Sequence, residues 1–163
     1  MSSPRAADAV LRTDRAGRGQ ALVEFTLVTP VFLLMLFGLL DLGRVVWAND
    51  VVANAAREGA RWASVHGISD MTTPATKQQI KSYTLNFAVA AGAGPQVTVC
   101  YSAVNIANGS VRCSGDSDEA GAANARGNMV TVSVTSTVSL VTASLLGLGS
   151  YTISSSSTMM INN

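Results

Sequence analysis

Charged side chains are scarce in this chain. Only 11 Lys and Arg and 10 Asp and Glu occur among its 163 residues, which leaves a formal net charge of +1. A protein that binds nucleic acid usually gathers basic side chains into a patch or stripe that faces the phosphates. A nearly neutral chain with so few charges has no such electrostatic footprint, so we expect no nucleic-acid partner.

Residues that carry chemistry are also few. The single histidine, His66, and two cysteines supply too few ligands for a zinc site. The acidic residues Asp116, Asp118 and Glu119 do not have the spacing of an EF-hand calcium loop. No glycine-rich phosphate loop follows a predicted strand, and no nucleophile stands with a base and an orienting acid. We therefore expect no enzyme activity, no cofactor and no metal site.

One long hydrophobic run dominates the N-terminal part of the chain. Residues 21–40 contain a single ionisable side chain, Glu24. As a helix this segment would span roughly 30 Å, enough for one bilayer crossing. A polar, arginine-rich leader precedes it, and we expect this leader to be flexible or weakly helical. A secretory signal peptide places its small-residue cleavage site after the apolar core, whereas here Gly19 comes before it.

This order of features resembles the type IV pilin superfamily, whose members have a short basic leader, a glycine at the cleavage point and a glutamate at the fifth position of the mature chain. With Gln20 as the first mature residue, Glu24 is the fifth. The likeness is strongest to TadE-like pseudopilins, minor subunits of tight-adherence (Tad/Flp) pili, and covers about residues 18–66. It is carried by Glu24-Phe25, Pro30, Gly38, Gly43-Arg44 and the segment Ala55-Ala56-Arg57-Glu58-Gly59-Ala60-Arg61-Trp62-Ala63-Ser64.

The resemblance implies a fate and a set of partners. A membrane prepilin peptidase would cut between Gly19 and Gln20, and the mature chain would join or prime a pilus. Its partners would be other pilus subunits, the inner-membrane assembly platform and membrane lipid. The resemblance assigns Glu24 and Phe25 to assembly, with the Glu24 carboxylate pairing with the new amine of Gln20 on this or a neighbouring subunit. Alternatively, Glu24 reaches the lipid headgroups.

The leader also indicates a topology. Four arginines lie within residues 1–19, and basic residues favour the cytoplasmic side of a membrane. We expect a single-pass protein with a cytoplasmic N-terminus and an extracytoplasmic C-terminal domain. The predicted divisions are a leader (1–19), an anchor and spine helix (20–66) and a head (67–163). The alternative to a pilin is an uncut, signal-anchored binding module that displays the head outside the cell.

Beyond the apolar run the helical pattern continues to about Ser64. A narrow apolar stripe of Val45, Val52, Ala56, Ala60 and Ala63 predicts a spine against which a head packs, and Gly67 fits a helix C-cap. Two sets of charged residues on this helix are candidates for contacts between subunits, and the alternative for each set is an ordinary solvent-exposed surface. They are Asp41 with Arg44, three residues apart, and Arg57, Glu58 and Arg61.

The pattern of the head changes from helix to strand after Pro95. A second helix is predicted over residues 76–91, and strands with alternating side chains over 97–103, 130–140 and 151–161. A long loop (105–128) has room for a short strand at 110–113, and residues 145–149 predict an apolar, glycine-broken loop. The expected architecture is α+β, a spine helix and a short helix packed on an antiparallel sheet of three or four strands.

Two cysteines, Cys100 and Cys113, fall in the predicted extracytoplasmic part with 12 residues between them. An oxidising compartment would allow them to form a disulfide, which would stabilise the fold by roughly 3 kcal/mol in the chain-entropy model. The alternative is a pair of buried thiols. A disulfide is the interpretation that fits the predicted location.

Overall fold

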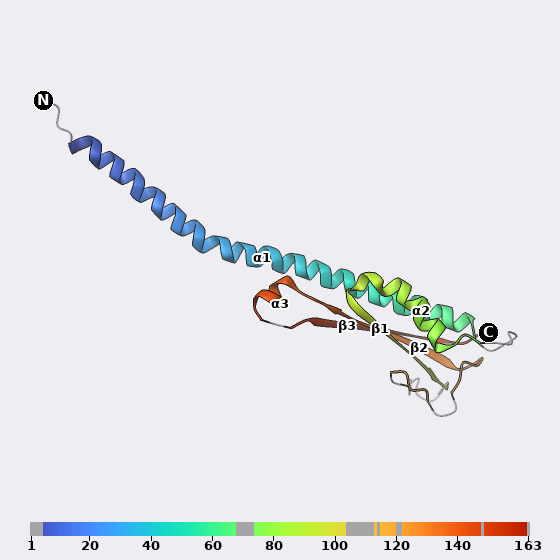
Figure 1. Cartoon of the computed structure of the whole chain (residues 1–163). Helices are drawn as coiled ribbons and strands as arrows, with labels where there is room; N and C mark the ends of the chain where they lie inside the picture. Colours follow the sequence, from blue (N-terminus) through green and yellow to red (C-terminus); the bar gives the residue numbers. More distant parts are fainter. Residues whose placement is uncertain are drawn as a thin grey trace. The chain divides into compact units, whose positions relative to one another are not determined.

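The chain folds as an α+β protein, as its sequence pattern predicts. The computed structural model describes residues 5–67, 74–103, 113, 115–119, 122–147 and 149–162, with only the backbone described for 5–18. Three strands form one antiparallel sheet in the order β1-β2-β3. The elements, shown in Figure 1, are α1 (Arg5–Val65), α2 (Lys77–Ala88), the 3₁₀ helix η1 (Val89–Ala91), β1 (Ala93–Ser102), β2 (Met129–Val138), α3 (Val141–Leu145) and β3 (Tyr151–Met160).

Two compact units divide the chain, residues 1–40 and residues 41–163. The first unit is the N-terminal part of α1, and the second unit is the rest of α1 with the head. The helix begins at Arg5, so the backbone of the predicted leader is helical, which is one of the two forms expected from its composition. The helix also continues through Pro30. A proline there removes one backbone hydrogen bond without ending the helix.

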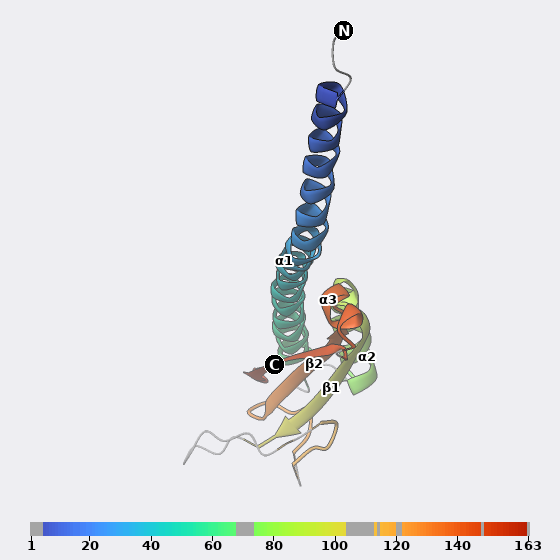
Figure 2. The same ribbon diagram turned by 90° about the vertical axis from the view of Figure 1, so that its left-hand side faces the viewer.

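Within the second unit, α1 and α2 lie on the same side of the sheet (Figures 1 and 2). The α1 residues that face the sheet are small, and small side chains let a helix approach a strand closely. The predicted stripe is confirmed except at Val45, which is half-buried. The α1 residues that are buried in the hydrophobic core are Ala48, Val52, Ala55, Ala56, Ala60 and Ala63.

The second helix begins with a capping box. The Thr76 hydroxyl accepts from the Gln79 backbone N–H, and the Gln79 side chain accepts from the Thr76 backbone N–H. Its inner face buries Ile80, Thr84 and Ala88. The helix predicted over 76–91 is therefore confirmed, with its last turn tightened into η1.

The alternating strand patterns are confirmed in their register. Val99 pairs with Val132, and Val132 with Ser157, so these positions share the face that packs against the helices. Val97, Val99 and Tyr101 are buried on that face. Because side chains alternate along a strand, Thr131 of β2 and its partner Thr158 of β3 lie on the opposite face. On this outer face the Thr131 and Thr158 hydroxyls hydrogen-bond at 2.8 Å.

Two local predictions differ from the structure. Gly67 does not have the positive φ of a left-handed helix cap. A larger residue is excluded at this position for another reason, because its Cβ would collide with the Ile161 side chain. The segment predicted as an apolar loop is preceded by a short helix, α3, before Gly147 turns the chain with φ 69°. The possible strand at 110–113 lies outside the described residues, apart from Cys113 itself.

Candidate functional site

The predicted cleavage junction lies within α1. Gln20 and Glu24 are one helical turn apart, and the Gln20 side-chain amide donates to the Glu24 carboxylate at 3.3 Å. Both side chains are exposed. Apart from its chain neighbours and the backbone of its own helix, nothing lies within 4 Å of the position a Cβ of Gly19 would take, so the backbone at the junction is open to approach. The helix thus places the Glu24 carboxylate one turn after Gln20, the residue that cleavage would make the N-terminus.

Apolar side chains surround Glu24 on every side of the helix. The helix is long and apolar enough to cross a membrane, and none of its most apolar stretch is buried inside the protein. In a membrane, lipid or other apolar helices would cover this surface and remove it from water. The exposed large apolar residues of this run are Leu22, Val23, Phe25, Leu27, Val28, Val31, Phe32, Leu33, Leu34, Met35, Leu36, Phe37, Leu39 and Leu40.

Asp41, directly after the apolar run, binds a segment 100 residues away in the sequence. Its Oδ1 accepts from the Val141 backbone N–H at 3.0 Å. Its Oδ2 accepts from the Thr142 backbone N–H at 2.7 Å and from the Thr142 hydroxyl at 2.6 Å. The carboxylate is buried, with 4% of the residue exposed. It caps the N-terminus of α3 from another helix, a role that its sequence neighbours do not indicate.

The other candidate contact residues on α1 face outward. Arg44, Arg57 and Arg61 are exposed, and Glu58 is half-buried. Among the described residues the ion pairs are Lys77–Asp118 and Lys81–Asp116, so neither the Asp41–Arg44 nor the Glu58–Arg61 spacing produces one here. A contact between subunits through these side chains therefore stays a prediction.

The acidic loop residues satisfy the free edge of β1. Backbone N–H groups of Val99, Tyr101 and Ala103 donate in turn to Asp116, Asp118 and Glu119, at 3.0, 2.8 and 3.0 Å. Since an unpaired strand edge can recruit another chain, these carboxylates close one edge of the sheet. The predicted disulfide is confirmed: Cys100 and Cys113 are bonded, with Cα atoms 5.9 Å apart, and hold the start of this loop against β1.

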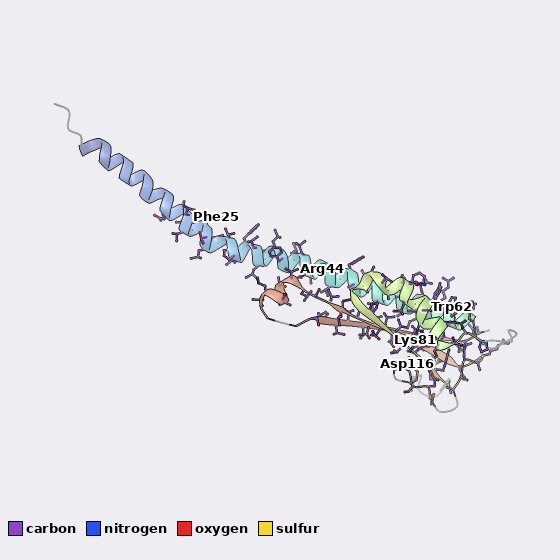
Figure 3. All side chains as sticks on the ribbon, in the orientation of Figure 1. Phe25, Arg44, Trp62, Lys81 and Asp116 are labelled. Carbon is purple, nitrogen blue, oxygen red and sulfur yellow. A yellow bond between two sulfur atoms is a disulfide. The ribbon has the colours of Figure 1, made fainter. Side chains whose placement is uncertain are left out.

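Two lysines of α2 pair with the same loop. Lys81 Nζ lies 2.6 Å from Asp116 Oδ2, and Lys77 Nζ lies 2.7 Å from Asp118 Oδ1 (Figure 3 labels Lys81 and Asp116). The hydrogen bond from Lys81, followed by the Val99 N–H, lowers the pKa of Asp116 from its ordinary value of 3.8. Burial, and secondarily the charge of Asp118, raises the pKa of Tyr101 to about 12. Lys77, Lys81, Asp116 and Asp118 therefore connect α2, the loop and β1, and these four residues are called the strap below.

The lowered pKa predicts how the head responds to acid. Because the folded-state pKa of Asp116 lies below the unfolded value, its contribution to stability is complete above the unfolded value and is lost as pH falls toward the folded one. We expect urea unfolding of the head to shift to lower urea between about pH 6 and about pH 3. An Asp116→Asn variant should be less stable near neutrality and show a smaller acid shift.

The matched control is Asp50→Asn, at an exposed position on α1 that makes no described hydrogen bond or ion pair. This variant should retain the full acid shift of the parent. An Asp116→Asn variant whose acid shift equals that of the parent would contradict the role assigned to the strap.

A row of aromatic side chains on α1 and α2 was not foreseen from the sequence. Trp62 stacks on His66, with ring centroids 4.2 Å apart, and on Tyr83 at 5.1 Å, while Phe87 follows Tyr83 at 5.2 Å. The four-residue spacings of Trp62 to His66 at the end of α1 and of Tyr83 to Phe87 on α2 indicate that each pair shares a helix face. Which ring of α1 meets which ring of α2 depends on how the helices pack. The His66 Nδ1–H also donates to the Trp62 carbonyl at 2.8 Å, which matches the predicted position of His66 at the helix end.

An open groove of about 420 Å³ lies between α1 and the start of β3, and no charged side chain lines it. Among the described residues, no group of three or more His, Cys, Asp or Glu side chains is placed to hold a metal ion. The features of this chain that point to a function are therefore the junction, the apolar helix surface and the contacts of the head with α1.

The comparisons with known proteins concern the N-terminal segment. A family model described as TadE-like protein matches residues 19–61. No curated protein and no solved structure matches the chain. The family match begins at the glycine of the predicted junction and ends on the upper part of α1, so the resemblance seen in the sequence is confirmed over this segment.

Proposed function

Since the segment from Gly19 to Arg61 is TadE-like, we propose that this chain is a minor pilin or pseudopilin of a Tad/Flp-type pilus. A prepilin peptidase removes residues 1–19, and the mature chain stays in the membrane until it is drawn into the pilus or primes its assembly. The observation that carries this proposal is Glu24. It is an exposed carboxylate in an otherwise charge-free apolar run, one turn after a glycine junction.

Cleavage would change the surroundings of Glu24 in a defined way. An ionised carboxylate within the apolar part of a bilayer costs a few kcal/mol unless it is paired or faces other protein. In the uncut helix its partner is the neutral amide of the Gln20 side chain. After cleavage Gln20 carries a positive amine, and the first turns of the new helix present unpaired N–H groups. Both changes place positive charge beside the Glu24 carboxylate.

The apolar helix surface is covered both before and after assembly, so its burial alone does not drive helices together. A subunit waiting in the membrane covers this surface with lipid, and assembly exchanges lipid for the equivalent surfaces of neighbouring helices. Tight helix packing then depends on van der Waals contact and on polar pairs. A Glu24 carboxylate that meets a Gln20 amine of a neighbour satisfies both charges at once, so it aligns subunits along the helix direction. The N-terminus is cytoplasmic and the head extracytoplasmic in this proposal.

Mass spectrometry of the protein extracted from membranes tests the cleavage. In a host with an active prepilin peptidase, the parent chain should begin at Gln20. A Gly19→Lys variant should retain residues 1–19, because a long side chain blocks approach to the junction, which is otherwise open.

An Arg18→Lys variant is the matched control, since it keeps the charge next to the junction and should be cut normally. An intact leader on the parent chain in this host would contradict the proposal and favour an uncut, anchored binding module.

A further inference from the structure

The connection between β2 and β3 exposes an apolar surface at one end of the head. Val141 and Leu145 of α3 are four residues apart and share one face of the helix, where they are 50% and 72% exposed. Leu146 follows at 60%. Ala143, on the other face, is buried. The helix is thus held to the head by a small side chain and turns its large apolar side chains outward.

The position of this surface is set by Asp41. Both carboxylate oxygens of Asp41 bind the N-terminus of α3 within 3.0 Å. Asp41 is the first residue of the second unit and the first charged residue after the apolar run that ends at Leu40. The α3 segment therefore lies at the end of the head from which the predicted membrane anchor leaves.

The composition around this surface suits lipid. From residue 127 to residue 163 the sequence has no Asp, Glu, Lys or Arg. On α1, the residues just beyond Asp41 include exposed Leu42, Val46 and Trp47, at 61%, 55% and 58%. Tryptophan is enriched where protein meets the headgroup layer of a bilayer. The same end of the head thus combines apolar side chains, an interfacial tryptophan and an absence of charge on the β2–β3 connection.

We infer that α3 and Leu146 form a second membrane contact, called here the lipid foot, which inserts Val141, Leu145 and Leu146 into the headgroup and acyl-chain boundary of the extracytoplasmic leaflet. Interfacial apolar elements of this kind enter a bilayer by about 5–10 Å. The foot would attach the head to the membrane at a second point besides α1. Asp41, which lies on α1 and binds α3, couples the two points of attachment. The foot rests only on the anchoring part of the proposed function and not on cleavage or on a pilus.

Fluorescence quenching in vesicles tests the foot. The full chain is reconstituted in phosphatidylcholine vesicles that carry bromine near the headgroup end of the acyl chains. One variant carries Leu145→Trp and the matched variant Met160→Trp, an exposed position at the far end of β3. After the parent emission from Trp47 and Trp62 is subtracted, the emission added by Leu145→Trp should fall about twofold, while that added by Met160→Trp stays unchanged.

Flotation separates the outcomes. A chain that floats with the vesicles while Leu145→Trp and Met160→Trp are equally unquenched overturns the foot and leaves the anchor intact. A chain that does not float overturns the anchor, and the foot with it. In the Leu145→Trp background, Asp41→Ala should restore most of the quenched emission without loss of flotation, because it removes both acceptors that hold α3 to α1. Quenching that survives Asp41→Ala at full strength would overturn the coupling between them.

Discussion

Replacing Gly59 with leucine is expected to destabilise the head by about 3 kcal/mol, the upper part of the range for overpacked cores. Gly59 lies where α1 meets both α2 and β2. A Cβ at this position would overlap the Thr84 hydroxyl and come within 3.1 Å of Val132 Cγ1. Thr84 is fully buried, and its hydroxyl donates to the Ile80 carbonyl at 2.7 Å, so it has no free space to move into.

Urea unfolding of the full chain in detergent, followed by the fluorescence of Trp62, measures this effect. Gly43→Leu is the matched control, because Gly43 lies in the same helix and nothing lies within 4 Å of the position its Cβ would take. That control should unfold at the urea concentration of the parent or slightly above it, since leucine favours helix over glycine. Equal midpoints for Gly59→Leu and the parent would show that the close approach of α1 to the sheet is not needed.

Replacing Glu24 with alanine should reduce the amount of this subunit in assembled pili by tenfold or more. A hydrogen-bonded pair that involves a charged group contributes about 1.5–3 kcal/mol, and 1.4 kcal/mol corresponds to a factor of about ten. The variant should still enter the membrane, because alanine removes the one charge from residues 21–40. The subunit should therefore accumulate in the membrane fraction and be depleted from sheared filaments.

Immunoblots of the two fractions measure this redistribution. The matched control is Asp50→Ala, which also removes one exposed carboxylate from α1 but lies beyond the apolar run. This control should appear in filaments at the parent level. Glu24→Ala filaments that contain the parent amount of the subunit would contradict the pairing of Glu24 with a terminal amine.

The two effects depend on different parts of α1 and so test the chain independently. Gly59→Leu acts on the packing of the head and should leave the Gly19 junction available to the peptidase. Glu24→Ala acts on the surface of the apolar run and should leave the urea midpoint of the head unchanged. A variant that changed both readouts would show that folding of the head and assembly are coupled.

The sequence by itself determined the features that depend on near neighbours. The alternation of β2 and the small-residue stripe of α1 are periodic patterns, which report the buried face of an element. The apolar run and the spacing from Gly19 to Glu24 can also be read from consecutive residues. They led to the α+β architecture, to the TadE-like resemblance now confirmed over residues 19–61, and, through the expected location of the head, to the disulfide.

Only the tertiary structure decided which distant groups meet. Asp41 appeared as the partner of Arg44 or of another subunit, yet its oxygens bind Thr142, 101 residues later. The acidic loop residues had no role that their spacing could indicate, yet they receive the N–H groups of β1 and the lysines of α2. Gly67 appeared as a cap, yet it makes room for Ile161. A carboxylate can accept hydrogen bonds from many donors, and a glycine can be required for its conformation or for its size. The choice among these depends on which segments the fold brings within a few ångströms, and no local pattern records that.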